Sequence, residues 1–360
     1  MQWYACYFSK SEALRISDSQ PMRFERLLTI KTRLSFGEKM AGRISIIILN
    51  WNGRKWLKES LPSILNQKVN ENFEVLLVDN GSIDDSVKYV KSRFPQVKLI
   101  ELGENYGFAE GNNQGLRHAI GDYLIFVNMD TKAEDGWLKN LVKAADSHPE
   151  YSILCSIQLP SQGKNRIRTL NAFGDPTPSP FESTLALTDS IFASGGCFLI
   201  KREWLNKLGC LFDPYYFCYA EDLELSLRTI LLGGRIGYVR DSRINHFIGG
   251  AGLSSSPKMH YLATRNTLLT YYKLFAPDNF ARIFPVNVAR KFIKFLRLKQ
   301  ILNVVALFGG IMGFFFCSYR YRMYRNEFAK IKKRTDKYVF QRFFYKREIE
   351  KKILKKIYRI

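Results

Sequence analysis

The stretch Ile44-Ser-Ile-Ile-Ile-Leu-Asn-Trp-Asn-Gly53 decides the fold class. Its short apolar run ends in polar turn residues, which is typical of a buried strand in a parallel sheet. Apolar residues then recur at helical spacing from Leu57 to Leu65, so a helix follows the strand. A strand, a turn and an amphipathic helix in this order predict an α/β fold.

The same alternation of short apolar runs and amphipathic stretches continues along the chain. It predicts strands over Ile44–Asn50, Phe73–Asp79, Val97–Glu101, Asp122–Asn128, Tyr151–Leu159, Phe192–Lys201 and Arg235–Val239. It predicts a Gly-rich loop that runs into a helix over Asn105–Ala119, and helices over Asp84–Arg93, Gly136–Ser147, Glu203–Leu208 and Glu221–Leu232. We therefore expect a Rossmann-like, mostly parallel sheet flanked by helices.

The segment from Ser161 to Asp189 interrupts this periodicity. It contains Asp175-Pro-Thr-Pro-Ser-Pro180, with proline at every second position. Proline fixes φ and removes a backbone N–H donor. We therefore expect an irregular loop here that faces the substrate.

The formal net charge of +22 is unevenly distributed. Residues 1–43 hold 8 Lys and Arg against 4 Asp and Glu, residues 44–281 hold 25 against 25, and residues 282–360 hold 22 against 4. A nucleic-acid enzyme needs cations around its active cleft, so the neutral middle argues against a nucleic-acid partner. The pattern predicts an N-terminal extension (1–43), a catalytic domain (44–281) and a basic, helical C-terminal tail (282–360).

Two features of the chain bear on its compartment. The six cysteines include no C-x-x-C pair, which predicts a reducing, cytosolic environment. The N-terminus has no apolar core typical of a secretory signal, so we expect the catalytic part not to be exported. Met40 lies four residues before Ile44, where the first predicted strand begins. Our hypothesis is that it is an alternative start and that residues 1–39 are dispensable.

The uncharged segment Ile301–Ser318 has Lys and Arg residues on both sides. It is shorter than the about 20 residues that a spanning helix needs. We favour a segment that lies in or re-enters the surface of an anionic membrane; a spanning helix and a helix buried against the domain are the alternatives. The tail thus predicts a peripheral or monotopic protein on the cytoplasmic face of the inner or plasma membrane.

Polar side chains stand where two predicted strands end, at the edge of a parallel sheet that faces the ligand crevice. Asp79 suits a hydrogen bond to a nucleobase or ribose, and a plain turn is the alternative. Asn128 and Asp130 project the same way and offer the oxygen ligands that Mg²⁺ prefers. Capping of the next helix is the alternative for Asp130.

Three acids in Ala220-Glu-Asp-Leu-Glu224 begin a predicted helix, and His246 follows later in the chain. The helix dipole favours acids in a first turn without any function. However, the aromatic residues between Tyr215 and Tyr219 lie directly before them. Such residues form a platform for a sugar ring or a lipid-linked acceptor, which favours a catalytic role for the acids.

Six motifs occur in the order typical of family 2 glycosyltransferases, and between Ile44 and Thr270 the chain resembles this family, most closely its rhamnosyltransferase-like branch. The motifs are Ser45-Ile-Ile-Ile-Leu-Asn-Trp-Asn-Gly53, Leu77-Val-Asp-Asn-Gly-Ser82, Asn105-Tyr-Gly-Phe-Ala-Glu-Gly-Asn-Asn-Gln-Gly115, Val127-Asn-Met-Asp-Thr131, Ser194-Gly-Gly-Cys-Phe-Leu-Ile-Lys-Arg202 and Glu221-Asp-Leu-Glu-Leu225. The resemblance implies a GT-A fold and a reaction that inverts the anomeric carbon.

The resemblance also implies which residues bind the donor. Asn50, Asp79 and Asn80 would lie at the nucleoside of a nucleotide-sugar. Gly107 and Asn112 would lie along the donor groove.

For the reaction itself, the resemblance implies a metal site and a base. Asp130 would hold Mg²⁺ or Mn²⁺ on the diphosphate, with His246 as a second ligand and Asn128 binding through water or not at all. Asp222 would be the general base, and Glu221 is the second candidate for this role.

The sequence therefore predicts an inverting, metal-dependent glycosyltransferase of cell-surface polysaccharide synthesis. The preferred donor is dTDP-L-rhamnose, with UDP-galactofuranose, UDP-galactose or UDP-glucose as alternatives, and the acceptor is a glycan or a polyprenyl-linked oligosaccharide. A nucleotidyltransferase and an inactive sugar-nucleotide-binding scaffold are alternatives of another class. A nucleotidyltransferase needs a basic, Gly-rich phosphate loop after the first strand, and Asn50-Trp-Asn-Gly53 is not one.

Overall fold

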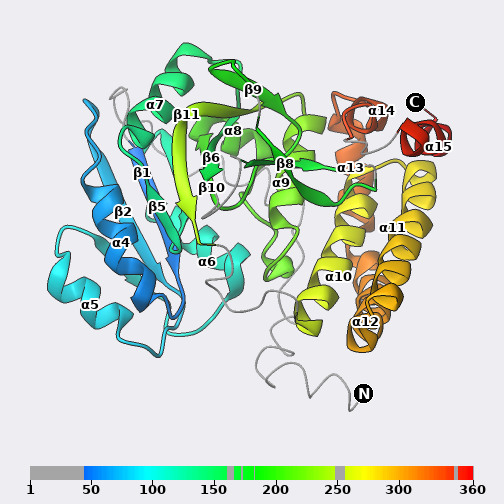
Figure 1. The fold of residues 1–360 in the computed structure, drawn as a ribbon, viewed down its shortest axis with the longest axis horizontal. Helices are drawn as coiled ribbons and strands as arrows, with labels where there is room; N and C mark the ends of the chain where they lie inside the picture. The colour runs from blue at the N-terminus through cyan, green and yellow to red at the C-terminus, as the bar shows by residue number, and fades with distance from the viewer. Residues whose placement is uncertain are drawn as a thin grey trace.

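A computed structural model of the chain describes residues 44–159, 166–171, 173–181, 183–247, 256–343 and 348–359. The N-terminal extension, Met40 included, lies outside the described residues. The strands are β1 (Ile44–Asn50), β2 (Phe73–Asp79), β3 (Lys98–Glu101), β4 (Tyr123–Asn128), β5 (Thr131–Ala133), β6 (Ile153–Leu159), β7 (Arg166–Leu170), β8 (Pro176–Pro180), β9 (Leu187–Ser190), β10 (Cys197–Lys201) and β11 (Ile236–His246). Within the described residues they form one sheet, whose main path runs β3-β2-β1-β4-β10-β6-β11-β5 (Figure 1).

Helices cover both faces of this sheet. They are α4 (Arg54–Leu65), α5 (Ser86–Arg93), α6 (Gly107–Leu116), α7 (Trp137–Ser147), α8 (Arg202–Leu208) and α9 (Glu221–Leu231). Alternate residues of a strand point to opposite faces, so Ile46 and Ile48 pack with α4, α5 and α7, whereas Ile47 packs in the core that contains α6, α8 and α9. The prediction of an α/β fold with flanking helices is confirmed.

The prediction of a mostly parallel sheet is wrong, because the sheet is mixed. β1 pairs in parallel with β2 and β4, β2 with β3, and β6 with β11. However, β10 lies antiparallel between β4 and β6, and β5, β7, β8 and β9 also pair antiparallel. A buried apolar run has the same pattern in either chain direction, so the strand direction is decided only by the connections.

The proline-rich segment is also more regular than its sequence predicts. Pro176–Pro180 forms β8, which pairs with β7 and with no other strand in the part of the chain described. Backbone N–H groups of a strand alternate between its two sides, so prolines at every second position leave the donors of Thr177 and Ser179 on the same side. Proline is tolerated on such edge strands. The prediction of an irregular loop is therefore wrong for β7, β8 and β9.

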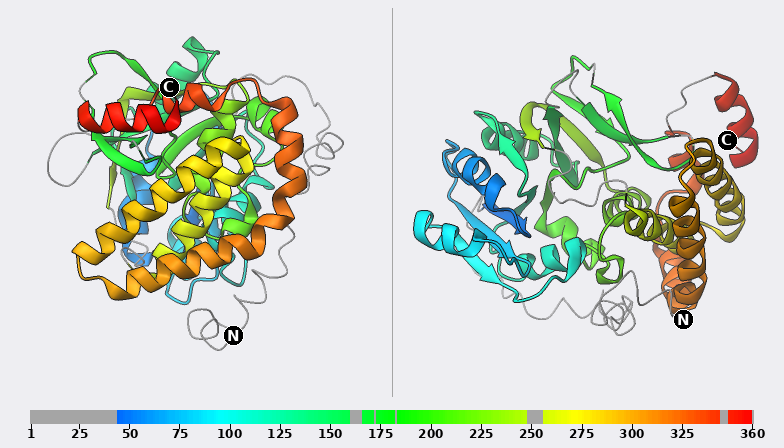
Figure 2. Two further views of the ribbon diagram at one scale, coloured as in Figure 1. Left: turned by 90° about the vertical axis from the view of Figure 1, so that its right-hand side faces the viewer. Right: turned by 60° about the horizontal axis from the view of Figure 1, so that its bottom comes forward.

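The C-terminal part of the chain is helical, as predicted. It comprises α10 (Pro257–Leu274), α11 (Pro277–Arg297), α12 (Ile301–Ser318), α13 (Arg322–Ile331), α14 (Asp336–Phe340) and α15 (Glu348–Tyr358). Figure 2 shows these helices gathered on one side of the sheet. Tyr321, Tyr324 and Phe328 lie in the same core as the residues of α9 and β10. The tail therefore packs on the domain, and the division at residue 282 stays a prediction.

Helix α12 is buried on one side and exposed on the other. Gly310 and Gly313 face α10, and a Cβ atom at Gly310 would lie 2.7 Å from the carbonyl oxygen of Tyr261, so the two helices approach closely there. The outward side of α12 is apolar and consists of Ile301, Leu302, Val305, Phe308, Met312, Phe315 and Phe316, and Tyr319 directly after the helix is also exposed. Among the described residues, only the stretch Ile301–Ile331 is long and apolar enough to cross a membrane, by length and composition alone.

Candidate functional site

The predicted nucleoside residues meet at the carboxyl ends of β1 and β2. Asn50 and Asp79 are neighbours in the parallel register of these strands. Asn50 Nδ2 donates to Asp79 Oδ1 at 2.9 Å and to Ser82 Oγ at 3.1 Å. Asn50 Oδ1 is buried and, in the part of the chain that the structure describes, has no hydrogen-bond partner. Because a buried acceptor without a partner is costly, this atom is suited to accept a hydrogen bond from a ligand.

Asn80 and Gly107 meet beside these residues, at the start of α6. Asn80 Nδ2 donates to Asn105 Oδ1 at 3.0 Å and to the carbonyl of Gly107 at 3.1 Å, and Asn80 Oδ1 accepts from Tyr106 N at 2.9 Å. The Asn80 amide therefore holds the start of α6 rather than leaving its groups free for a ligand. Asn112 is buried inside α6 and donates to the Phe108 carbonyl at 2.8 Å.

The predicted metal ligands are brought together by the pairing of β5 with β11. His246 is paired with Thr131 in the register of these strands, directly beside Asp130. His246 Nε2 lies 3.3 Å from Asp130 Oδ1 and 3.5 Å from Asn128 Nδ2. The nitrogen His246 Nδ1 is buried and has no hydrogen-bond partner among the described residues.

This group fits a divalent cation. It combines a carboxylate, an imidazole and an amide, which are ligands that Mn²⁺ and Mg²⁺ accept. In the part of the chain described, no group of three or more His, Cys, Asp or Glu side chains is placed to hold a metal. A cation bound by Asp130 and His246 would therefore take its other ligands from water or from the phosphates of a substrate.

The acids Glu221 and Asp222 lie at the first turn of α9, opposite the turn that joins β9 to β10. Asp222 Oδ2 accepts from Gly195 N at 3.4 Å, and Asp222 Oδ1 accepts from Leu223 N at 2.8 Å. On the next residue of that turn, a Cβ atom at Gly196 would lie 2.9 Å from His246 Nδ1. The turn thus places the Asp222 carboxylate and the predicted metal ligands on one side of the crevice.

Burial raises the pKa of Asp222, and the guanidinium of Arg168 and the N–H groups of Gly195 and Leu223 offset part of this effect. Burial and the Asp222 carboxylate raise the pKa of Glu221 well above its ordinary value. A carboxylate with a raised pKa is a stronger base once it is ionised. Both carboxylates therefore have a higher proton affinity than ordinary carboxylates.

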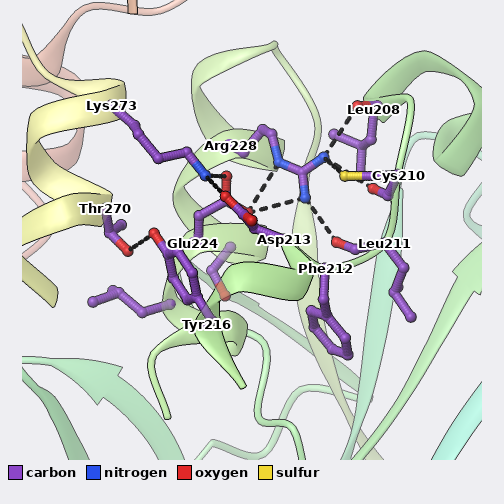
Figure 3. Close-up of polar contacts among 12 residues, drawn as sticks. Leu208, Cys210, Leu211, Phe212, Asp213, Tyr216, Glu224, Arg228, Thr270 and Lys273 are labelled. Carbon is purple, nitrogen blue, oxygen red and sulfur yellow. Dashed lines mark hydrogen bonds and ion pairs between the residues drawn. The ribbon is translucent and has the colours of Figure 1, made fainter. Parts of the chain in front are cut away.

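Glu224, the third acid of this motif, has a different environment. It is fully buried, with Oε2 3.0 Å from Arg228 Nη2 and Oε1 3.2 Å from Lys273 Nζ. Figure 3 shows both cations and Asp213 around the Glu224 carboxylate. Burial alone would raise the pKa of Glu224, but Arg228 and Lys273 together hold it below its ordinary value. Glu224 is thus a structural anion beneath the site.

Sequence reasoning missed three residues of this region. Ser82 Oγ accepts from Asn50 Nδ2 and from Asn52 N at 2.9 Å. Gln158 Nε2 donates to Ser194 Oγ at 2.6 Å and supports the turn beside Asp222. Arg168 is close enough to Asp222 to lower its pKa. Gln158 has the largest polar side chain of a mostly apolar strand, and this is the signal that could have found it.

The comparison with known families agrees with this geometry. The model of glycosyl transferase family 2 matches residues 45–209. An uncharacterized glycosyltransferase of Bacillus subtilis, YfnE, is 36% identical over 117 residues, which are 32% of this chain and 30% of that protein. The N-acetylglucosaminyl-diphospho-decaprenol L-rhamnosyltransferase of Mycobacterium tuberculosis is 25% identical over 207 residues, which are 48% of this chain and 66% of that protein. The O-antigen biosynthesis protein RfbC of Myxococcus xanthus is 24% identical over 232 residues, with 60% of this chain and 18% of that protein covered. The chain thus spans less than a third of YfnE and of RfbC.

Solved structures share the fold. Residues 1–349 of Staphylococcus aureus TarS in complex with UDP-GlcNAc superpose with a TM-score of 0.53 at 17% identity, covering 81% of this chain and 92% of that one. GalNAc-T7 with UDP, GalNAc and Mn²⁺ superposes with a TM-score of 0.54 at 18% identity, covering 66% of this chain and 51% of that one. The expected GT-A-like fold is therefore present. The family model thus supports a glycosyl transferase family 2 domain over residues 45–209, which lie within this fold.

Proposed function

We propose that the chain is an inverting, metal-dependent glycosyltransferase that moves a sugar from a nucleotide-sugar to a glycan or a polyprenyl-linked acceptor in cell-surface polysaccharide synthesis. The observation that carries this proposal is the position of Asp222 across the Gly195–Gly196 turn from Asp130 and His246. A base and a cation site on one side of a nucleoside crevice are the two groups that glycosyl transfer requires.

Each group has a defined task. The crevice at Asn50 and Asp79 binds and orients the nucleoside. Asp130 and His246 would hold the cation, which reduces the charge that develops on the diphosphate leaving group. Asp222 takes the proton of the acceptor hydroxyl while that oxygen attacks the anomeric carbon from the face opposite the diphosphate. Attack from that face inverts the configuration.

The preferred donor is dTDP-L-rhamnose. The similarity to the mycobacterial rhamnosyltransferase supports this choice. The solved structures similar in fold hold UDP or UDP-GlcNAc, so UDP-galactofuranose, UDP-galactose and UDP-glucose are the alternatives.

Thermal unfolding with nucleotides tests the donor and the metal together. The purified protein is heated with UDP, dTDP, GDP or CMP, each with and without Mn²⁺. A ligand at a hundredfold excess over its Kd stabilises the native state by about 2.7 kcal/mol, so we expect one diphosphate to raise the Tm by several degrees only with Mn²⁺.

The variant Asp130→Ala should lose the Mn²⁺-dependent part of this shift, whereas the exposed neighbour Asp135→Ala should keep it. An unchanged shift in Asp130→Ala would remove Asp130 from the metal site. A chain that binds none of the four nucleotides under any condition would contradict the proposed function.

The proposal also includes a place for the protein on the cytoplasmic face of an anionic membrane. The exposed side of α12 carries large apolar side chains, with Phe308 and Phe316 52% and 66% exposed. Exposed cations flank it, among them Lys294 and Arg297 before α12 and Arg322 after it. An apolar helix face between cations matches the acyl boundary and the headgroups of anionic lipid.

Vesicle flotation tests this part. We expect the protein to float with phosphatidylcholine vesicles that contain 30% phosphatidylglycerol and to float less with pure phosphatidylcholine, because the basic flanks contribute about 1 kcal/mol per residue. The double variant Phe308→Asp, Phe316→Asp should stay in solution. Leu185→Asp is the matched control, because Leu185 is 65% exposed but lies outside the tail. Equal flotation of the double variant and the control would exclude α12 as the membrane contact.

A further inference from the structure

The backbone directly before the catalytic acids is strained. Phe217, Tyr219 and Ala220 have φ angles of 61°, 70° and 64°. Residues other than glycine rarely adopt this left-handed conformation, because the Cβ atom then approaches the backbone. Such a segment persists only where its surroundings hold it, and it is found most often at functional sites.

One side chain of α10, that of Asn266, binds the backbone carbonyls of this segment. Asn266 Nδ2 lies 2.9 Å from the carbonyl oxygen of Tyr216, 3.0 Å from that of Cys218 and 2.7 Å from that of Tyr219. Asn266 is fully buried. Its two N–H groups are therefore shared among three carbonyls of the strained segment, and water does not compete for them.

A second side chain orients the Asn266 amide. Arg265 Nε donates to Asn266 Oδ1 at 2.9 Å, and Arg265 Nη2 donates to the carbonyl of Tyr215 at 3.1 Å. The donor to Oδ1 fixes which side of the amide carries the N–H groups. Arg265 and Asn266 together thus bind the backbone from residue 215 to residue 219.

The same segment touches the donor side of the crevice. The carbonyl of Phe217 accepts from Ala109 N at 3.0 Å, in the first turn of α6. A Cβ atom at Gly107 would lie 2.5 Å from this carbonyl oxygen, so the close contact requires glycine there. A shift of the strained segment would therefore move the wall of the donor groove and the start of α9 at the same time.

We propose that Asn266 is a positioning residue for the transfer reaction: it holds Tyr216–Ala220 in the conformation that sets Asp222 against the donor groove. This inference rests on the proposed function for its effect on catalysis. The effect on the conformation of the segment is independent of that function.

The N-terminal end of the segment, at residues 213–216, is held by other contacts. Asp213 Oδ2 binds Lys273 Nζ at 2.8 Å, and the hydroxyl of Tyr216 is 2.8 Å from Thr270 Oγ1. Both contacts are drawn in Figure 3. Loss of the Asn266 amide should therefore release residues 217–220 without unfolding the segment from residue 213 to residue 216.

The catalytic test compares Asn266→Ala and Asn266→Asp with the control Asn303→Ala, which removes another buried Asn amide, one in α12 that binds Gln300 directly before the helix. A misplacement of about 1 Å costs about 100-fold in rate, so we expect kcat to fall at least tenfold in both Asn266 variants while KM for the donor changes less. Asn303→Ala should keep its kcat. A carboxylate donates no hydrogen bond, but its protonated form donates one, so the activity of Asn266→Asp relative to Asn266→Ala should rise as the pH is lowered.

The structural test needs no substrate. Cys218 lies in the segment, and burial raises the pKa of its thiol. Alkylation of Cys218 by iodoacetamide, followed by mass spectrometry and compared with the buried Cys197 in the same sample, should be at least tenfold faster in Asn266→Ala than in the unmodified chain and unchanged in Asn303→Ala.

The outcomes separate the two proposals. Unchanged alkylation of Cys218 in Asn266→Ala would overturn the inference, whatever the activity. Faster alkylation with an undiminished kcat would show that Asn266 holds the segment but does not position the base, which also overturns it. An unmodified chain that binds no nucleotide and transfers no sugar would overturn the proposed function, and the alkylation result would still decide whether Asn266 holds the segment.

Discussion

Asp222→Asn should lower kcat for sugar transfer at least 100-fold and leave the affinity for the nucleotide unchanged. Asparagine has the same shape, and its oxygen can still accept from Gly195 N or Leu223 N, the two donors to Asp222. It cannot take a proton from the acceptor hydroxyl, and loss of a general base costs about 10²–10⁴ in rate. Single-turnover transfer and nucleotide titration on the same sample measure the two quantities.

Glu221→Gln is the matched control for this substitution. Glu221 is the adjacent acid and its Oε2 has no hydrogen-bond partner in the structure, so it is the second candidate for the base. We expect a smaller loss of kcat in Glu221→Gln than in Asp222→Asn. Near-normal turnover in Asp222→Asn with a large loss in Glu221→Gln would move the role to Glu221.

The pH dependence gives a further check on the base. The pKa of Asp222 is raised, so Asp222 loses its proton at a higher pH than an ordinary aspartic acid, whose pKa is about 3.9. The rate should therefore rise with pH through this raised pKa and then level off. Asp222→Asn should lack this rise, because asparagine does not titrate.

Lys273→Met should lower the free energy of unfolding by about 3–5 kcal/mol, because removal of one partner from a buried ion pair leaves charge without compensation. Lys273 Nζ lies 2.8 Å from Asp213 Oδ2 and 3.2 Å from Glu224 Oε1, and all three side chains are fully buried. Arg228 stays bound to Glu224 in the variant, so Asp213 is the anion left unpaired. Urea denaturation measures the loss.

Two further variants make this result specific. Lys330→Met removes the pair with Glu327, in which the lysine side chain is 68% exposed, and should cost less than about 1 kcal/mol. Adding Asp213→Asn to Lys273→Met removes one charge of each sign and should restore part of the lost stability. If Lys273→Met lowers the free energy of unfolding no more than Lys330→Met does, the buried ion pair does not stabilise the fold as expected.

The pKa of Glu224 determines the direction in which the free energy of unfolding changes with pH. Its folded-state pKa lies below the ordinary value because Arg228 and Lys273 outweigh the effect of burial. The carboxylate therefore stabilises the fold above its unfolded pKa of about 4.3, and this contribution is lost as the pH falls through the folded pKa. Lys273→Met removes one of the two cations that lower the pKa of Glu224. The difference in the free energy of unfolding between the unmodified protein and Lys273→Met should therefore narrow in acid.

The sequence by itself determined the α/β class and the positions at which polar residues end the buried apolar runs. The strands that carry predicted site residues end in polar residues. A buried apolar run must stop where a polar side chain reaches the ligand-binding edge of the sheet. Asn50, Asp79, Asn128 and Asp130 could be placed at that edge for this reason. The helical tail and its exposed apolar segment also follow from composition and periodicity.

Strand direction and the proline-rich strand were decided by tertiary structure. β10 runs antiparallel to β4 and β6 because the chain enters the sheet from the edge at which the Gly195–Gly196 turn lies. No residue of β10 encodes that direction. β8 forms because β7 offers hydrogen-bond partners on the side that its prolines leave free. The strands that flank β10 are distant from it along the chain, whereas β7 is the strand that directly precedes β8.

The surroundings of the three acids at the start of α9 are the clearest example of what only the tertiary structure decided. Three adjacent acids in one motif look equivalent in the sequence, yet Glu224 is neutralised by Arg228 and Lys273, whereas Glu221 and Asp222 have raised pKa values. Asn266 lies 44 positions from Asp222 along the chain but binds the segment directly before α9, the helix that carries Asp222. The local sequence determines which side chains are available, whereas burial and distant partners determine which of them are charged, held or free to react.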